Sequence, residues 1–419
     1  MRRYCALLFL SFTSVPLVTA LVNPEASRGP PNGANLRSIL TAASNNWASG
    51  TAISFPGQDS FDNATERWAT YRPPTYAASI SPATEKDVAT AVKLATSNRL
   101  SFLATGGRHG YNTDLASLQN GIAIDLSRLN QVRVDRQART LTVGPGARFG
   151  NIVGPVSDAG FEIQTGTASC PSMIGVTIGG GIGRQMGTLG LVADALISAR
   201  LVTADGKIVD VSANSNPELF WGIRGAGFNF GIITQATYKL QPNPTRTTYT
   251  SVDVIFPAPK NASYFRMLET VLANQPARLS VTSSIMYNST SNQAQIAGSW
   301  VYNGPRDVAL RVMAPMLALG PSVTSVSDVR WEDVSRTAAF GADAIGCVPG
   351  RNWNVYSANL RTFRASLGQT AFSRMDAFYR ENPEARVSTI LLEAFPNQAA
   401  RAIPNSATAF PWRDTATFV

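Results

Sequence analysis

Histidine occurs only once in this chain of 419 residues, at His109 within the run 105–111. Catalytic Ser-His-Asp triads, two-histidine zinc sites and histidine proton shuttles need free imidazoles, and at most one exists here. Gly106, Gly107 and Gly110 surround it, and glycines let a backbone approach a bulky ligand and turn its N–H groups toward negative oxygens. The position is therefore either a ligand-binding turn or an ordinary turn that contains a histidine.

Two further glycine clusters follow, at 175–183 and at 225–231. A ligand with two phosphates needs several turns of closely approaching backbone N–H groups, so a dinucleotide is the natural candidate. A Rossmann nicotinamide site fits poorly. The third glycine of the cluster that begins at Gly225 comes late, at Gly231, and the segment after it has the pattern of a strand rather than a helix.

The elements around His109 follow an α/β pattern. An extended stretch at 77–80 leads to a capping-box start at Thr84–Asp87, a helix with one apolar face, and a buried strand at 100–104. His109 is therefore expected on the loop after a strand, the end where open α/β sheets bind ligands. Further on, we expect a strand at 121–126, a hairpin joining 132–134 to 141–143, a helix at 149–159 closed by Gly160, a hairpin around Asp205-Gly206, and a strand at 232–240.

The second half of the chain differs in character. Residues 241–244 are rich in proline and asparagine, and we interpret them as a linker. Beyond them, strands are expected near 252–256, 279–286 and 295–302, and helices near 265–272, 308–319 and 360–379. Strands beside helices, without glycine loops, predict an antiparallel sheet backed by helices.

The glycine clusters, in their order, resemble the FAD-linked oxidases of the vanillyl-alcohol oxidase superfamily, in particular the berberine-bridge-like, PCMH-type group. The resemblance runs from about Arg72 to Leu240. It is carried by 73–74 with 81–88, by Gly106-Gly107-Arg108-His109-Gly110, by 179–183, by 190–194 and by 219–231. It implies an α+β chain with a PCMH-type FAD-binding domain of two α/β subdomains at 72–242 and a substrate domain at 243–419, preceded by a signal peptide at 1–20 and an N-terminal segment at 21–71.

In that family the histidine at the position of His109 is bonded to the 8α carbon of FAD, and the first two glycine loops hold the pyrophosphate. The resemblance thus implies a covalent flavin on His109. The cofactor-binding residues that we predict are His109, Thr105, Gly106, Gly107, Arg108, Gly110, Cys170, Gly175, Gly179, Gly180, Gly181, Gly183, Asp194, Asn229, Gly231 and Ile232. No metal is expected.

Arg108 and Cys170 differ from the usual pattern of the family. Arg108 replaces the more usual glycine, which crowds the loop and adds a cation near phosphate. Cys170, in Ser169-Cys170-Pro171-Ser172, resembles a cysteine that some members bond to the flavin as a second tether, although the spacing to the next glycines is shorter here. The alternatives for Cys170 are a buried thiol or a disulfide with Cys347.

The resemblance also supplies a candidate base. Glu393, within the apolar run 390–395, resembles the family's catalytic carboxylate, and burial there would raise its pKa toward neutrality. The alternative is that its side chain points to solvent. Trp353, Tyr356 and Tyr302 are candidate aromatics of a substrate pocket, with core packing as the alternative.

The ends of the chain and its composition suggest secretion. A basic start, an apolar middle and a small-residue exit make residues 1–20 a cleaved signal peptide, and Asn63, Asn261 and Asn288 lie in glycosylation sequons. The formal charge of +9 comes from scattered basic residues, so nucleic acid is not an expected partner, and no later run is apolar enough to cross a membrane. Residues 409–413 resemble the segment that precedes a final return to the flavin domain, and we expect that return segment to be lacking.

The sequence therefore predicts a secreted FAD-dependent oxidase. It would remove a hydride from an alcohol, amine or activated C–H of a small, secondary-metabolite-like substrate, with molecular oxygen as electron acceptor. The alternative is a secreted flavin-binding protein with little or no turnover.

Overall fold

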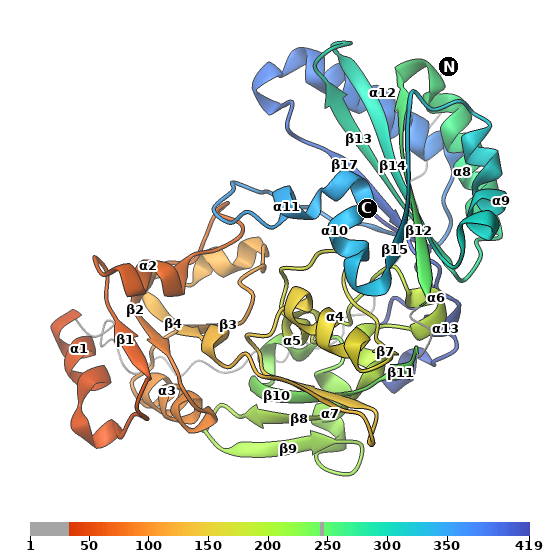
Figure 1. Cartoon of the computed structure of the whole chain (residues 1–419). Helices are drawn as coiled ribbons and strands as arrows, with labels where there is room; N and C mark the ends of the chain where they lie inside the picture. The colour runs from red at the N-terminus through yellow and green to blue at the C-terminus, as the bar shows by residue number, and fades with distance from the viewer. Residues whose placement is uncertain (1–32, 244–246) are drawn as a thin grey trace, which may run out of the picture.

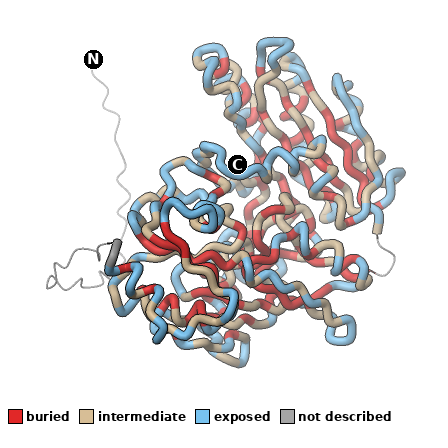
Figure 2. Tube along the Cα trace, turned by 60° about the vertical axis from the view of Figure 1, so that its left-hand side comes forward, coloured by how far each residue is buried: buried red, intermediate tan, exposed pale blue. Residues whose placement is uncertain are grey.

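The structure is a computed structural model that describes residues 33–243 and 247–419. The predicted signal peptide at 1–20 and the first part of the predicted N-terminal segment lie outside the described residues. Figure 1 shows two bodies, with the substrate domain packed across one end of the flavin-domain sheets. Figure 2 shows buried backbone running through both bodies.

The first flavin-domain sheet has the order β1-β2-β4-β3, in which β2, β4 and β3 run parallel. Its strands are β1 (Ala52–Ser54), β2 (Tyr76–Ser81), β3 (Phe102–Thr105) and β4 (Gly121–Asp125), with α1 (Gly33–Thr41), α2 (Asp59–Thr65) and α3 (Glu85–Ser97) around it. The capping box is confirmed, because Thr84 and Asp87 bond each other's backbone N–H groups. The strand before the His109 loop is confirmed too, ending at Thr105, although it is partly buried and not buried as predicted.

The second flavin-domain sheet is antiparallel, with the order β5-β6-β10-β8-β9. Its strands are β5 (Val132–Asp135), β6 (Thr140–Val143), β8 (Leu196–Val202), β9 (Ile208–Ser212) and β10 (Ile232–Lys239). Both predicted hairpins are present. The helices of this half are α4 (Phe149–Asp158), α5 (Met173–Thr177), α6 (Met186–Leu189) and α7 (Pro217–Gly222). Gly160 follows α4 with φ +84°, the left-handed conformation expected of a glycine beyond a helix end.

The substrate domain is built on an antiparallel sheet of order β15-β12-β14-β13-β17-β18-β16. The strands are β12 (Thr248–Pro257), β13 (Leu279–Asn288), β14 (Gln293–Asn303), β15 (Val323–Arg330), β16 (Asn359–Leu360), β17 (Ile390–Ala394) and β18 (Thr417–Phe418). Three helices, α8 (Asn261–Ala273), α9 (Arg306–Leu317) and α12 (Ala365–Glu381), cover the face that points away from the flavin domain (Figure 1). The predicted antiparallel sheet backed by helices is confirmed.

Some sequence predictions need correction. The proposed linker begins with a strand, β11 (Gln241–Pro242), which pairs with β7 (Phe161–Glu162). The segment is therefore fastened to the flavin domain as far as it is described. The strand β15 escaped prediction because most of its positions are exposed and only Val326, Ser327 and Val329 are partly buried. The final helices, α10 (Val334–Gly341), α11 (Asp343–Gly346) and α13 (Gln398–Arg401), are short and were also not predicted.

Candidate active site

The loop after β3 holds His109 against two neighbouring loops of the flavin domain. A Cβ on Gly106 would lie 2.1 Å from the Pro145 carbonyl oxygen, and a Cβ on Gly107 would lie 2.6 Å from the Ser172 nitrogen. Glycine is required at both positions because backbone meets backbone there. The first glycine cluster thus brings the His109 loop onto the segment that contains Cys170.

The environment of His109 keeps its imidazole neutral. Burial, reinforced by the nearby Arg148 cation, lowers the pKa of His109 to about 4, although the Asp343 carboxylate acts in the opposite direction. At neutral pH the ring therefore carries a free nitrogen lone pair. A neutral imidazole is the form that can bond to carbon.

Arg108 has protein partners for its guanidinium. Its backbone has φ +62°, the left-handed region that explains why glycine is usual at this position. Its guanidinium forms an ion pair with Asp125 at 3.5 Å and donates to the Asn63 carbonyl oxygen. The charge of Arg108 is thus balanced by an acidic side chain of the flavin domain, and its predicted place near phosphate stays a prediction.

The second and third glycine clusters form one unit. Gly180 and Gly181 have φ of +100° and +82°, and their carbonyl oxygens accept from Ala193 N and Val192 N at 2.9 Å each. The third cluster joins through Gly227, whose N–H donates to the Ile178 carbonyl oxygen at 3.0 Å. Predicted residues from 179–183, 192–194 and 227–229 are therefore neighbours.

The structure also places four further residues that were predicted to bind the cofactor, namely Gly175, Asn229, Gly231 and Ile232. Asn229 ends a short 3-10 helix at 227–229. Gly231 has φ +144°, and a Cβ there would lie 2.4 Å from the Val202 carbonyl oxygen. Ile232 begins β10 and is buried in the core of the first subdomain. Gly175 lies in α5, where its N–H donates to the capping Ser172 hydroxyl at 3.1 Å.

The C-terminal segment packs on the glycine loops. The Phe410 ring fills the space beside Gly180, where a Cβ would meet it at 2.4 Å, and a Cβ on Gly225 would meet the Phe410 nitrogen at 2.3 Å. Nearby, Arg413 forms a buried bidentate ion pair with Asp194 at 2.7 and 2.9 Å. Residues 409–413 therefore reach the flavin domain themselves, and Asp194 holds them there.

Cys170 is joined to Cys347 by a disulfide. Of the alternatives that the sequence left open, the disulfide is the one observed. The prediction of Cys170 as a flavin-bonding residue is therefore corrected, because the disulfide leaves no thiol at that position.

Glu393 lies where the substrate sheet meets the flavin domain. It sits in β17 opposite Thr282 of β13, and Thr167 of the flavin domain donates to its Oε1 at 3.4 Å. Burial raises the pKa of Glu393, and the Arg184 guanidinium and the Thr167 hydrogen bond partly offset this rise. The carboxylate also acts electrostatically on Tyr111, on the His109 loop, raising the pKa of that phenol in addition to burial.

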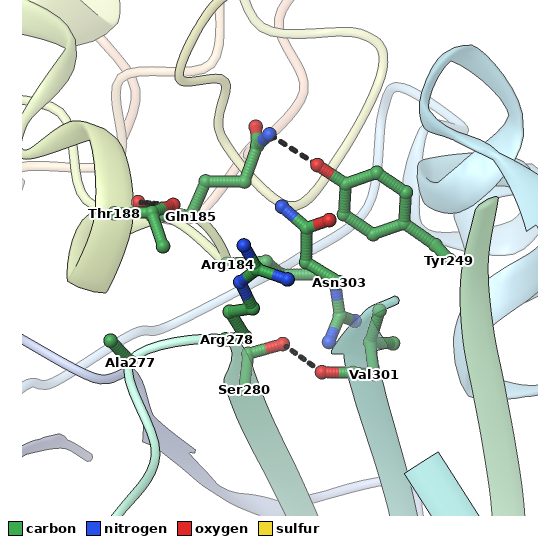
Figure 3. A pocket seen from close by; sticks show the side chains of 9 residues that line it. All are labelled: Arg184, Gln185, Thr188, Tyr249, Ala277, Arg278, Ser280, Val301 and Asn303. Atoms are coloured by element: carbon green, nitrogen blue, oxygen red, sulfur yellow. Dashed lines mark hydrogen bonds between the residues drawn. The ribbon is translucent and has the colours of Figure 1, made fainter. Parts of the chain in front are cut away.

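Arg184 was not predicted as a site residue, although it directly follows the glycine loop at 179–183. Its Nε and Nη1 are buried and have no partner among the described residues, and burial lowers its pKa. Figure 3 shows it among side chains of both domains, lining a cavity of about 10 Å³, roughly room for one water molecule. The carboxylates that act on it electrostatically are Glu393 and Asp253.

The candidate pocket aromatics separate in the structure. Trp353 stacks on Trp68, whose ring also stacks on His109. Tyr356 is 82% exposed, and Tyr302 packs against the substrate-domain core. Only Trp353 is thus connected to the His109 loop.

The residues present fit FAD on two observations. Gly106 and Gly107 of the His109 loop pack on the backbone at 145 and 170–172 so closely that a Cβ would collide, and Gly183 packs in the same way on the backbone at 165. Beside the glycine loop at 179–183, two nitrogens of Arg184 and the Gln164 Nε2, which lies against Gly183, are buried donors without a partner among the described residues. Close backbone with spare donors is what a dinucleotide requires.

Comparison with known proteins gives the same class. Residues 76–212 match the family model described as an FAD binding domain. The chain is 48% identical to the FAD-linked oxidoreductase OXR1 of Pyricularia oryzae, over 88% of this chain and 72% of that protein. It is 43% identical to the FAD-linked oxidoreductase srdI of Neurospora crassa, over 98% of this chain and 82% of that protein.

Solved structures share the fold. BBE-like 1 of Physcomitrella patens has a TM-score of 0.75 at 21% identity, covering 91% of this chain and 82% of its own. The glucooligosaccharide oxidase of Acremonium strictum, described with a 6-S-cysteinyl, 8α-N1-histidyl FAD, has a TM-score of 0.74 at 24% identity, covering 91% and 80%.

Fold and site together define an FAD-dependent flavoprotein whose residues 76–212 match an FAD binding domain and whose fold is shared with a solved BBE-like protein. The chain belongs to the FAD-linked oxidoreductases and is an enzyme of that family.

Proposed function

We propose that this protein is an oxidase that carries FAD covalently on His109. It would take a hydride from an alcohol, amine or activated C–H of a small organic substrate of secondary-metabolite type and pass the electrons to molecular oxygen. The observation that carries this proposal is the position of Glu393. A partly accessible carboxylate with a raised pKa lies between the substrate sheet and the His109 and glycine loops.

In this proposal Glu393 accepts the proton that leaves the substrate heteroatom. Burial raises its pKa, which makes the carboxylate a stronger base, while the Arg184 cation keeps enough of it ionised to act. Thr167 holds one carboxylate oxygen, so the other is available to a substrate. FAD, when bound, supplies the hydride acceptor.

The surroundings of His109 support the attachment. Its imidazole is neutral because of burial and Arg148, as a nitrogen that bonds to carbon must be. It is also the chain's single histidine, which leaves Glu393 as the base favoured by position.

We also propose that the protein enters the secretory pathway. The composition of residues 1–20 is that of a signal peptide, Asn63 lies in a sequon and is exposed, and a disulfide suits an oxidising compartment. Asn261 and Asn288 are half-buried, so Asn63 is the sequon best placed for glycosylation. Within the ranges that the structure describes, no helix combines the length and apolar character needed to cross a membrane.

The test compares wild-type protein with Glu393→Gln on a panel of alcohols and amines. Oxygen consumption and hydrogen peroxide release measure turnover, and anaerobic bleaching of the flavin measures the reductive step alone. We expect Glu393→Gln to bleach at least about a hundredfold more slowly with FAD still bound. Equal bleaching rates would remove Glu393 from the chemistry. If the wild-type protein binds FAD but none of the tested substrates reduces the flavin, the alternative of a flavin-binding protein without turnover would be favoured.

A further inference from the structure

Residues 343–353 of the substrate domain, which we name the clasp, cross to the flavin domain beside His109. The Asp343 carboxylate accepts from the Ser169 N–H at 2.8 Å and from its hydroxyl at 2.5 Å. The disulfide between Cys347 and Cys170 fixes the next turn. The beginning of the clasp is therefore attached to the segment on which Gly107 packs.

The end of the clasp pairs with the segment that contains Trp68. Gly350 N donates to the Arg67 carbonyl oxygen at 2.8 Å, and Arg351 N donates to the Trp68 carbonyl oxygen at 3.2 Å. Ala69 and Arg351 form a parallel bridge, and the Trp68 Nε1 donates to the Gly346 carbonyl oxygen at 2.6 Å. Trp68 is thus held by the clasp through both its backbone and its side chain.

The turn that precedes the clasp is also held in place. Ala339 and Phe340 have φ of +58° and +56°, a left-handed conformation that is unfavourable for residues other than glycine. The buried Asp253 carboxylate accepts from both N–H groups, at 3.0 and 2.8 Å. The chain therefore leaves α10 in one fixed direction, and the clasp begins from a defined position.

Trp68 connects the clasp to His109. Its ring lies 5.3 Å from the imidazole centroid at an interplanar angle of 26°, and 5.9 Å from the Trp353 ring at 18°. Its backbone N–H donates to the Arg108 carbonyl oxygen at 3.2 Å, so it also fixes the turn that carries the imidazole. The Trp353 Nε1 is buried without a partner in the described chain, so stacking rather than a hydrogen bond fixes that ring.

We propose that Trp68, supported by Trp353 of the clasp, is a positioning residue for attachment of the flavin to His109. The stacked indole holds the neutral imidazole in one orientation, which reduces the entropic cost of reaching the bonding geometry. This inference rests on the proposed function. In the attachment, a bond forms between an imidazole nitrogen and the flavin 8α carbon. One C–H and the imidazole N–H are broken, the two hydrogens and two electrons reduce the flavin ring, and molecular oxygen reoxidises it to give hydrogen peroxide.

The position of Trp353 also sets the order of folding and flavin attachment. Because Trp353 comes from the substrate domain and Trp68 from the N-terminal part of the chain, the stack forms only after the two bodies have docked and the clasp has closed. Attachment should therefore follow folding of the whole chain.

The test uses full-length protein produced under riboflavin limitation and then supplied with FAD. The variants are Trp68→Ala, Trp68→Phe and Trp353→Ala, and the control is Trp412→Ala, which removes a half-exposed indole from the C-terminal segment. The readouts are the fraction of the His109 peptide that carries flavin mass over time, and the affinity for FAD before attachment, measured by quenching of flavin fluorescence.

We expect Trp68→Ala to slow attachment at least tenfold and Trp353→Ala to slow it severalfold. Trp68→Phe, which keeps a stacked ring, and Trp412→Ala should stay within about twofold of wild type, and the affinity for unattached FAD should change less than threefold. Wild-type rates in Trp68→Ala would overturn the inference. Loss of FAD affinity in both Trp68 variants would also overturn it, because the indole would then serve folding or binding. An unmodified His109 peptide in the wild type would instead contradict the proposed function.

Discussion

Breaking the ion pair between Arg413 and Asp194 should loosen the C-terminal segment from the flavin domain. The two side chains are 2% and 5% exposed, and Arg413 also donates to the Ala400 carbonyl oxygen and the Thr408 hydroxyl. Removing one partner of a buried pair leaves an uncompensated charge, which costs about 3–5 kcal/mol. We therefore expect Arg413→Met and Asp194→Asn each to lose about that much stability, and the double variant to lose less than their sum, because it buries neither charge alone.

Chemical denaturation followed by tryptophan fluorescence measures these losses, and hydrogen exchange over 404–413 shows whether the segment opens. The matched control is Arg311→Met, which removes an exposed pair with Asp307 in α9 and should cost about 0.5 kcal/mol or less. Folded Asp194→Asn should keep its FAD. Losses below about 1 kcal/mol would refute this reasoning. Loss of FAD at unchanged stability would also refute it and would support the cofactor-binding role that the sequence predicts for Asp194.

Four further predictions follow from the site and its surroundings. Arg184→Gln should raise the pKa of Glu393, because the Arg184 cation lowers it, and should move the acid limb of the pH profile of kcat to higher pH. An acid limb that does not move would show that Arg184 does not act on the group that titrates in catalysis. The folded-state pKa of Glu393 is raised, so the protonated carboxyl contributes stability at low pH, and this contribution is lost as pH rises through that pKa. Glu393→Gln should therefore unfold at a higher temperature than wild type at pH 7, and this difference should disappear below about pH 4. Gly180→Ala should cost about 2–4 kcal/mol in denaturant unfolding through its φ and the Phe410 ring, with Phe410→Ala restoring part of the loss; full stability of Gly180→Ala would contradict the packing. Cys347→Ala removes a crosslink over a separation of 177 residues, worth at most about 5 kcal/mol by chain entropy, and a reductant should destabilise wild type but not the variant.

Much of the flavin domain could be predicted because its signals are local. Thr84 and Asp87 mark a helix start, Gly160 a helix end and Asp205-Gly206 a hairpin, and each acts within a few residues. The order of the glycine clusters then gave the domain and its cofactor.

The rest depends on contacts between distant parts of the chain. Nothing near Trp68 in the sequence indicates that it stacks on both His109 and Trp353. The ion pair of Arg108 could not be predicted either, because its partner Asp125 comes from another strand. The disulfide of Cys170 could be stated only as an alternative, because its partner Cys347 lies 177 residues away in the sequence.

The central claim is that this enzyme bonds its flavin through His109, and the most direct test is the mass of the peptide that contains this residue. Purified protein is precipitated in acid, digested and analysed by mass spectrometry, with His109→Ala as the control. We expect the colour to stay with the precipitate and the His109 peptide to carry flavin mass. A colourless precipitate with this peptide at its unmodified mass would contradict the account.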